Sequence, residues 1–198
     1  MPRPPDQAKR RDLLDRVRDH LVRNGLAGLS LRPLARALGT SDRMLLYYFG
    51  TKERMVAEAL ALDERRPLRQ AQELLADAGS PGDPGRVRRF MEEIWQRFGR
   101  PDLRAALPLY VEIMAASVLH SDRYGPVMRD VLAEWTALLA SAFRDLGVAE
   151  ERARAEADLL VDACLGLLIA PLGDGDWARA DAAFHTLLDR LEPAWHIP

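Results

Sequence analysis

The chain has 198 residues, enough for one large core or two modest ones, and its 28 Lys and Arg side chains nearly balance 30 Asp and Glu at a net charge of −2. Cys164 is the only cysteine, which excludes an intramolecular disulfide and a cysteine-rich metal site. Because the sequence has neither the apolar core of a signal peptide nor an apolar run of the roughly 20 residues that cross a bilayer, we expect a cytoplasmic protein.

The first predicted element is a helix over residues 6–24 that ends at Gly25. Its apolar residues recur at helical spacing and form one inward stripe: Leu13, Leu14, Val17, Leu21 and Val22. Arg10, Arg11 and Arg18 lie off this stripe, where they either face solvent or lie near a phosphate.

Residues 31–49 predict two short helices joined by a tight turn. Ser30 is a favoured N-cap residue for the first of them, and the apolar residues that follow it share one helical face: Leu31, Leu34, Ala35 and Leu38. Gly39 supplies the left-handed conformation that ends a helix, and Ser41 can cap the second helix, which runs to Phe49. This pattern is a helix-turn-helix, and it predicts DNA binding.

The second of these helices has two distinct faces. Leu45 and Phe49 can pack inward on the first helix. This leaves the other face for the major groove of a duplex, with Asp42, Arg43, Met44, Tyr47 and Tyr48. There, Arg43 could pair with a guanine and Met44 could touch a thymine methyl group. The predicted DNA-contacting set, phosphate-binding residues included, is Ser30, Arg32, Thr40, Ser41, Asp42, Arg43, Met44, Tyr47, Tyr48 and Lys52. The alternative is a helical hairpin whose surface carries these residues without a nucleic-acid partner.

Positive charge is concentrated near the N-terminus. Residues 1–56 hold twelve Lys or Arg against six acidic residues, a net charge of +6, which leaves −8 for the rest of the chain. A basic end on an acidic body would direct one end of the molecule toward phosphate and repel DNA from the other. Chance clustering is the alternative.

The remaining chain reads as helix throughout, without an alternating strand pattern or an internal repeat. A fourth helix begins after Lys52, and Pro67 should kink or restart it. Residues 79–85 form a Gly- and Pro-rich loop between body helices. Further helices are predicted after this loop to residue 98 and over residues 102–118, 126–146, 150–170 and 176–191. We therefore expect an all-α fold of about nine to ten helices.

The helix-turn-helix segment resembles the DNA-binding domain of the tetracycline-repressor-like (TetR) family. The residues that match the family pattern in order and spacing are Ser30, Leu34, Ala35, Gly39, Ser41, Leu45, Phe49 and Lys52, and the resemblance covers about residues 6–60. The chain departs from the pattern at Thr40, Arg43 and Leu46, where the family has valine, often a small residue, and tyrosine. The resemblance implies a three-helix DNA-binding head, residues 1–52, and a helical effector-binding and dimerisation body, residues 53–198, in a bacterial repressor.

The last helices suggest a homodimer. The segment from about residue 150 to 170 becomes apolar on nearly all sides, and such a helix needs more cover than one small body provides. TetR-like proteins pair through their C-terminal helices, and two heads could then read the two halves of a palindromic operator. The alternative is that these apolar stripes only fill the core of a monomer.

The resemblance also implies a small-molecule effector that releases the repressor from its operator. Six large side chains of the body are suited to line an apolar pocket: Met91, Trp95, Phe98, Tyr110, Met114 and Trp135. The alternative for each of them is ordinary core packing. Arg104, Glu112 and His120 could orient a polar ligand group or form a solvated stripe.

No enzyme, cofactor or metal centre is expected. The four histidines are scattered, and the chain has neither a phosphate-binding glycine loop nor a glycine-flanked nucleophilic serine. The alternative to a ligand-responsive repressor is a DNA-binding dimer without an effector, controlled by a protein partner or by its own abundance.

Overall fold

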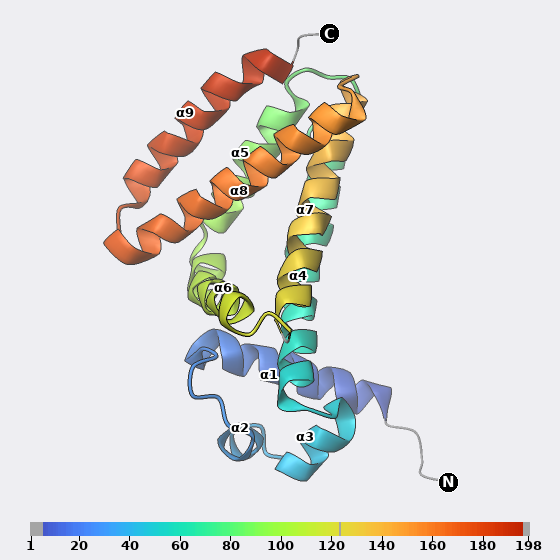
Figure 1. Cartoon of the computed structure of the whole chain (residues 1–198), viewed down its shortest axis with the longest axis vertical. Helices are drawn as coiled ribbons and strands as arrows, with labels where there is room; N and C mark the ends of the chain where they lie inside the picture. Colours follow the sequence, from blue (N-terminus) through green and yellow to red (C-terminus); the bar gives the residue numbers. More distant parts are fainter. Residues whose placement is uncertain (1–5, 123, 196–198) are drawn as a thin grey trace. The chain divides into compact units, whose positions relative to one another are not determined.

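The structure, a computed structural model, describes residues 6–122 and 124–195, without the side chains of residues 60–67, 69, 102 and 127. Within this part of the chain all regular structure is helical (Figure 1). The helices are α1 (Gln7–Asn24), α2 (Leu31–Ala37), α3 (Asp42–Phe49), α4 (Lys52–Asp77), α5 (Arg86–Phe98), α6 (Pro101–Leu119), α7 (Gly125–Asp145), α8 (Glu150–Asp174) and α9 (Trp177–Trp195). The predicted all-α fold is confirmed.

The local signals for helix ends behave as expected in α1. The Asp6 carboxylate accepts the backbone N–H of Ala8 at 2.9 Å and so caps the first turn. At the other end, Gly25 has a φ of 73°, a conformation that costs glycine little. The later helices end within four residues of their predicted limits. The fourth helix does not restart at Pro67, since α4 continues to Asp77.

The chain forms two compact units, each made of two separate stretches of sequence. Unit 1 comprises residues 1–66 and 108–129, and unit 2 comprises residues 67–107 and 130–198. Helices α1 to α3 lie entirely in unit 1, and α5, α8 and α9 lie entirely in unit 2.

The core of unit 1 joins the three N-terminal helices to the start of α4 and the second half of α6. It contains the predicted stripe of α1, the inward residues of α2 and α3, and Met55, Val56 and Ala59 of α4. Leu109 and Ile113 of α6 and Tyr124, just before α7, are buried in the same cluster. Burying these apolar side chains is the main favourable term that holds the short helices α2 and α3 in place.

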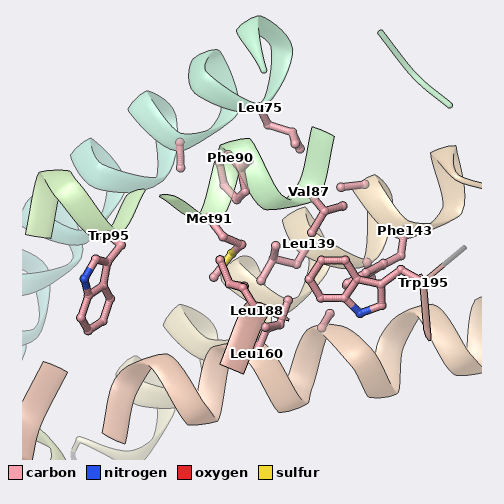
Figure 2. Close-up of a cluster of buried hydrophobic side chains, with 14 of the residues drawn as sticks. Leu75, Val87, Phe90, Met91, Trp95, Leu139, Phe143, Leu160, Leu188 and Trp195 are labelled. Carbon is pink, nitrogen blue, oxygen red and sulfur yellow. The ribbon is translucent and has the colours of Figure 1, made fainter. Parts of the chain in front are cut away.

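Unit 2 has its own core, formed by α5, α7, α8, α9 and the end of α4 (Figure 2). Met91 of α5 points into this cluster toward Leu160 and Leu188. Arg86 is buried beside it, where its Nε donates to the carbonyl of Leu75 at 3.1 Å and its guanidinium pairs with the Asp145 carboxylate. Helices α8 and α9 pack side by side in this unit (Figure 1).

Candidate nucleic-acid interface

The turn between α2 and α3 is closed by hydrogen bonds from residues that the sequence singles out. Gly39 has a φ of 62°, which lets the backbone N–H of Thr40 reach the carbonyl of Ala35 at 2.9 Å. The Ser41 hydroxyl accepts the backbone N–H of Met44 at 3.2 Å, as predicted for an N-cap residue. The predicted helix-turn-helix is therefore present.

Helix α3 separates a buried face from an exposed one. Leu45 and Phe49 are each only 1 % exposed and pack in the core of unit 1. Arg43 is exposed on the opposite side, as is Tyr47, whose ring meets that of Tyr48 edge-on at a centroid distance of 5.2 Å. No ion pair or side-chain hydrogen bond of the described residues uses the Arg43 guanidinium, so it is available to an external partner.

The other predicted contact residues lie around this face with different local roles. Asp42 forms an exposed ion pair with Arg32 of α2, in which Oδ2 of Asp42 lies 3.7 Å from Nε of Arg32. Lys52 is half-buried and donates from Nζ to the carbonyl of Leu29 at 3.1 Å. Ser30 occupies the N-cap position of α2, but its hydroxyl makes no capping hydrogen bond to the described backbone. Met44, Tyr48 and Thr40 are half-buried.

Two arginines of α1 contact the ends of α2 and α3: Arg10, for which the sequence left solvent or a nearby phosphate open, and Arg16, for which it made no prediction. Arg10 of α1 donates from Nε to the carbonyl of Tyr48 at 3.4 Å, lies over the Phe49 ring and pairs with Glu58. Arg16 donates to the carbonyl of Leu38 at the end of α2. Each guanidinium satisfies a carbonyl at a helix C-terminus, where a positive charge is also favourable. For Arg10 the sequence indicated only a position off the apolar stripe.

Glu112 has a structural role that its spacing did not predict. Its carboxylate accepts the backbone N–H groups of Leu26 and Ala27, the latter at 2.9 Å, and so ties α6 to the loop that follows α1. Neither proposed sequence role, a ligand-orienting group or a member of a solvated stripe, includes these contacts. His120 is exposed.

The structure divides the six predicted ligand-contacting residues between the two units. Tyr110 and Met114 are half-buried in unit 1, and the other four belong to unit 2. Trp95 stacks on Phe184 at a centroid distance of 4.4 Å and donates from Nε1 to Asp181 at 3.0 Å. Met91 is core, as Figure 2 shows. Phe98 and Trp135 are only partly buried, with ring centroids 6.3 Å apart.

The described residues offer no group of three or more His, Cys, Asp or Glu side chains that could hold a metal ion. Cys164 of α8 packs against the core of unit 2, and burial raises the pKa of its thiol to about 12. None of the helices, over the residues described, combines the length and apolarity that crossing a bilayer requires.

Comparison with known proteins agrees with this geometry. Residues 13–59 match the family model described as "Bacterial regulatory proteins, tetR family". That range contains α2, α3 and the turn between them. No curated protein matches the chain in a sequence comparison.

Solved structures similar to the chain include three bacterial regulators. A protein of Pseudomonas aeruginosa PAO1, classed as a transcriptional regulator, has a TM-score of 0.76 and 23 % identity over 98 % of this chain and 95 % of its own. A regulator of Saccharomonospora viridis, solved with choline, has a TM-score of 0.73 and 21 % identity over 94 % of this chain and 97 % of its own. A protein of Mesorhizobium loti MAFF303099, classed in the TetR family, has a TM-score of 0.63 and 16 % identity over 90 % of this chain and 84 % of its own. At these identities the likeness concerns the fold.

Proposed function

We propose that this chain, whose residues 13–59 match the model of the tetR family of bacterial regulatory proteins, is a DNA-binding transcriptional regulator that represses transcription as a homodimer and leaves its operator when a small molecule binds. The observation that carries the proposal is the arrangement of α3. Its inner face is anchored by Leu45 and Phe49, while the guanidinium of Arg43, which pairs with none of the described residues, lies on the outer face. A helix presented in this way fits the major groove, and a free guanidinium can donate two hydrogen bonds to one guanine.

The dimer would form through α8 and α9. One face of α8 carries Leu159, Ala163, Gly166 and Ala170 at helical spacing, and the Leu159 side chain is 47 % exposed. Small residues allow two helices to approach closely, and covering Leu159 would remove apolar surface from water. A two-fold dimer reads a palindromic operator with half-sites about 34 to 36 Å apart, one turn of DNA.

The effector would be small and largely apolar, and we place its contacts at Phe98 and Trp135 of unit 2. These two aromatic side chains are partly buried and remain accessible, whereas Met91 and Trp95 are occupied with core packing. Partly exposed aromatic rings can bind an apolar group or a quaternary ammonium ion. Choline, which the Saccharomonospora viridis regulator binds, is therefore a suitable first probe.

DNA binding is tested with the full chain and duplexes selected from a random library. We expect affinity to fall with salt at a log–log slope of about −0.9 for each phosphate neutralised. Arg43→Ala should reduce the preference at one base pair by about 1 to 3 kcal/mol, and Arg129→Ala, an exposed arginine of α7, serves as the control. Equal specificity in the Arg43 variant and the wild type would contradict the proposed reading face.

The response to an effector is tested separately. Choline and a panel of small aromatic compounds are screened for a rise in melting temperature and, in parallel, for release of the selected operator. If binding of the effector is coupled to DNA release, the same compound must raise the melting temperature and release the operator. A regulator that binds its operator but shows neither effect with any compound would favour control by a protein partner or by abundance.

A further inference from the structure

The outer face of α3 carries an exposed leucine that the sequence pattern did not assign to DNA. The Leu46 side chain is 41 % exposed, whereas the adjacent Leu45 is 1 % exposed in the core of unit 1. An isolated exposed leucine is common on protein surfaces. This one, however, lies on the element whose exposed face we place in the major groove.

Leu46 and Arg43 lie next to each other on this face. They are three residues apart in one helix, so their side chains are neighbours on its surface and are separated by about 4.5 Å along its axis. Successive base pairs of a duplex are about 3.4 Å apart. Two side chains with this spacing can therefore contact neighbouring base pairs.

The chemistry of a leucine side chain limits what it can read. It has no hydrogen-bond donor or acceptor, so it cannot distinguish the polar edges of guanine, adenine or cytosine. The thymine 5-methyl group is the apolar feature in the major groove, and apolar side chains contact it. Contact with this methyl group would also remove part of the exposed Leu46 surface from water.

We propose that Leu46 reads the methyl group of a thymine next to the base pair that Arg43 contacts. This inference rests on the proposed placement of α3 in the major groove. It assigns to the operator half-site a thymine beside the guanine read by Arg43, and it makes Leu46 a specificity-determining residue. The tyrosine usual at this position in the family carries a hydroxyl group, and Leu46 does not.

The test removes the methyl group from the DNA and the leucine from the protein, separately and together. Each thymine of the selected operator is replaced in both half-sites by deoxyuridine, which keeps the Watson–Crick edge and lacks the methyl group. Affinities of the wild type, Leu46→Ala and Leu119→Ala are measured by fluorescence anisotropy. Leu119 is another exposed leucine of unit 1, on α6, and provides the matched control.

For the wild type and Leu119→Ala, deoxyuridine at one position, the thymine next to the Arg43 contact, should lower the affinity about fourfold per half-site. Leu46→Ala should bind the duplex with thymine and the duplex with deoxyuridine at that position equally well. A wild type insensitive to every deoxyuridine, or a Leu46→Ala variant with undiminished sensitivity, would overturn the inference and leave the DNA-binding proposal intact. If no duplex is bound with sequence preference, both fail. Since the wild type alone already tests for a methyl contact, misfolding of Leu46→Ala could not hide a negative result.

Discussion

The carboxylate of Glu112, in α6, accepts the backbone N–H of Ala27, 85 residues earlier in the chain, at 2.9 Å. The same carboxylate accepts the N–H of Leu26. Two backbone donors that follow the end of α1 therefore depend on one side chain from a distant helix. Gly25 is part of this arrangement, because a Cβ atom there would lie 2.5 Å from Oε1 of Glu112.

Replacing Glu112 should destabilise unit 1. Glu112→Ala leaves one partly buried amide, that of Leu26, and one exposed amide, that of Ala27, without their acceptor, and hydrogen bonds to charged groups each contribute about 1.5 to 3 kcal/mol. Because water can reach these amides, we expect a loss of about 1 to 3 kcal/mol in the free energy of unfolding, measured in urea. Glu134→Ala, an exposed carboxylate of α7, is the control. An unfolding midpoint equal to that of the wild type would contradict this role.

Arg10 should matter for DNA binding without touching DNA. Arg10→Met keeps much of the aliphatic contact but loses the bond to the Tyr48 carbonyl and the pair with Glu58. We expect about 1 kcal/mol lower stability and weaker operator binding, since the end of α3 is held less firmly. The comparison is Arg11→Met, an exposed arginine one residue later in α1. If the two variants bind the operator equally well, Arg10 does not position α3.

Lys52 should contribute to affinity and not to sequence preference. Its Nζ donates to the Leu29 carbonyl, and its other two N–H donors remain for a phosphate. Lys52→Ala should weaken binding to all duplexes by a similar factor and reduce the magnitude of the log–log salt slope by about 1. Anisotropy titrations at several salt concentrations measure both. A change confined to one base position would instead indicate base contact.

Leu159 provides a test of the dimer. An arginine at this exposed position of α8 would place a charge in the proposed interface, where it would have to be desolvated. Leu159→Arg should therefore shift sedimentation toward the monomer and lower operator affinity. Val118→Arg, at an exposed apolar residue of α6, should do neither. Dimer formation unaffected by Leu159→Arg would remove α8 from the interface.

The Cys164 thiol should be nearly inert in the native protein. Burial raises its pKa to about 12, while an unfolded cysteine has a pKa of about 8.5. At pH 8 the native thiol should react with a thiol-specific reagent more than about 100-fold more slowly than in urea. Because the pKa is higher in the folded than in the unfolded protein, the contribution of this thiol to the free energy of unfolding is fully present below about pH 8.5. It is lost as the pH rises toward 12. Equal reaction rates in buffer and urea would show that the thiol is accessible.

The local signals were enough to predict the helix-turn-helix from sequence. Gly39 and Ser41 determine where α2 ends and α3 begins through their own backbone and side-chain chemistry, and both act within a few residues. The burial of Leu45 and Phe49 follows from helical spacing alone. Such features need no knowledge of the rest of the chain.

Long-range partners could not be predicted in the same way. Glu112 meets its amides across 85 residues of sequence, and Arg10 meets Glu58 across 48. A charged residue off an apolar stripe has the same pattern whether it faces water or holds a helix end. Trp95 is a similar case. Its size and spacing are compatible both with lining a pocket and with core packing, and in the structure it stacks on Phe184.

Unit 1 has a consequence for anyone who would transplant its DNA specificity into another regulator. Leu109, Ile113 and Tyr124 complete its core from a stretch of chain that follows an excursion through unit 2. A fragment cut off after residue 66 would lose these three side chains and expose the apolar surface that they cover. A working chimera must therefore carry both stretches, or recreate their contacts in the recipient, because no single crossover point separates the reading head from the remainder.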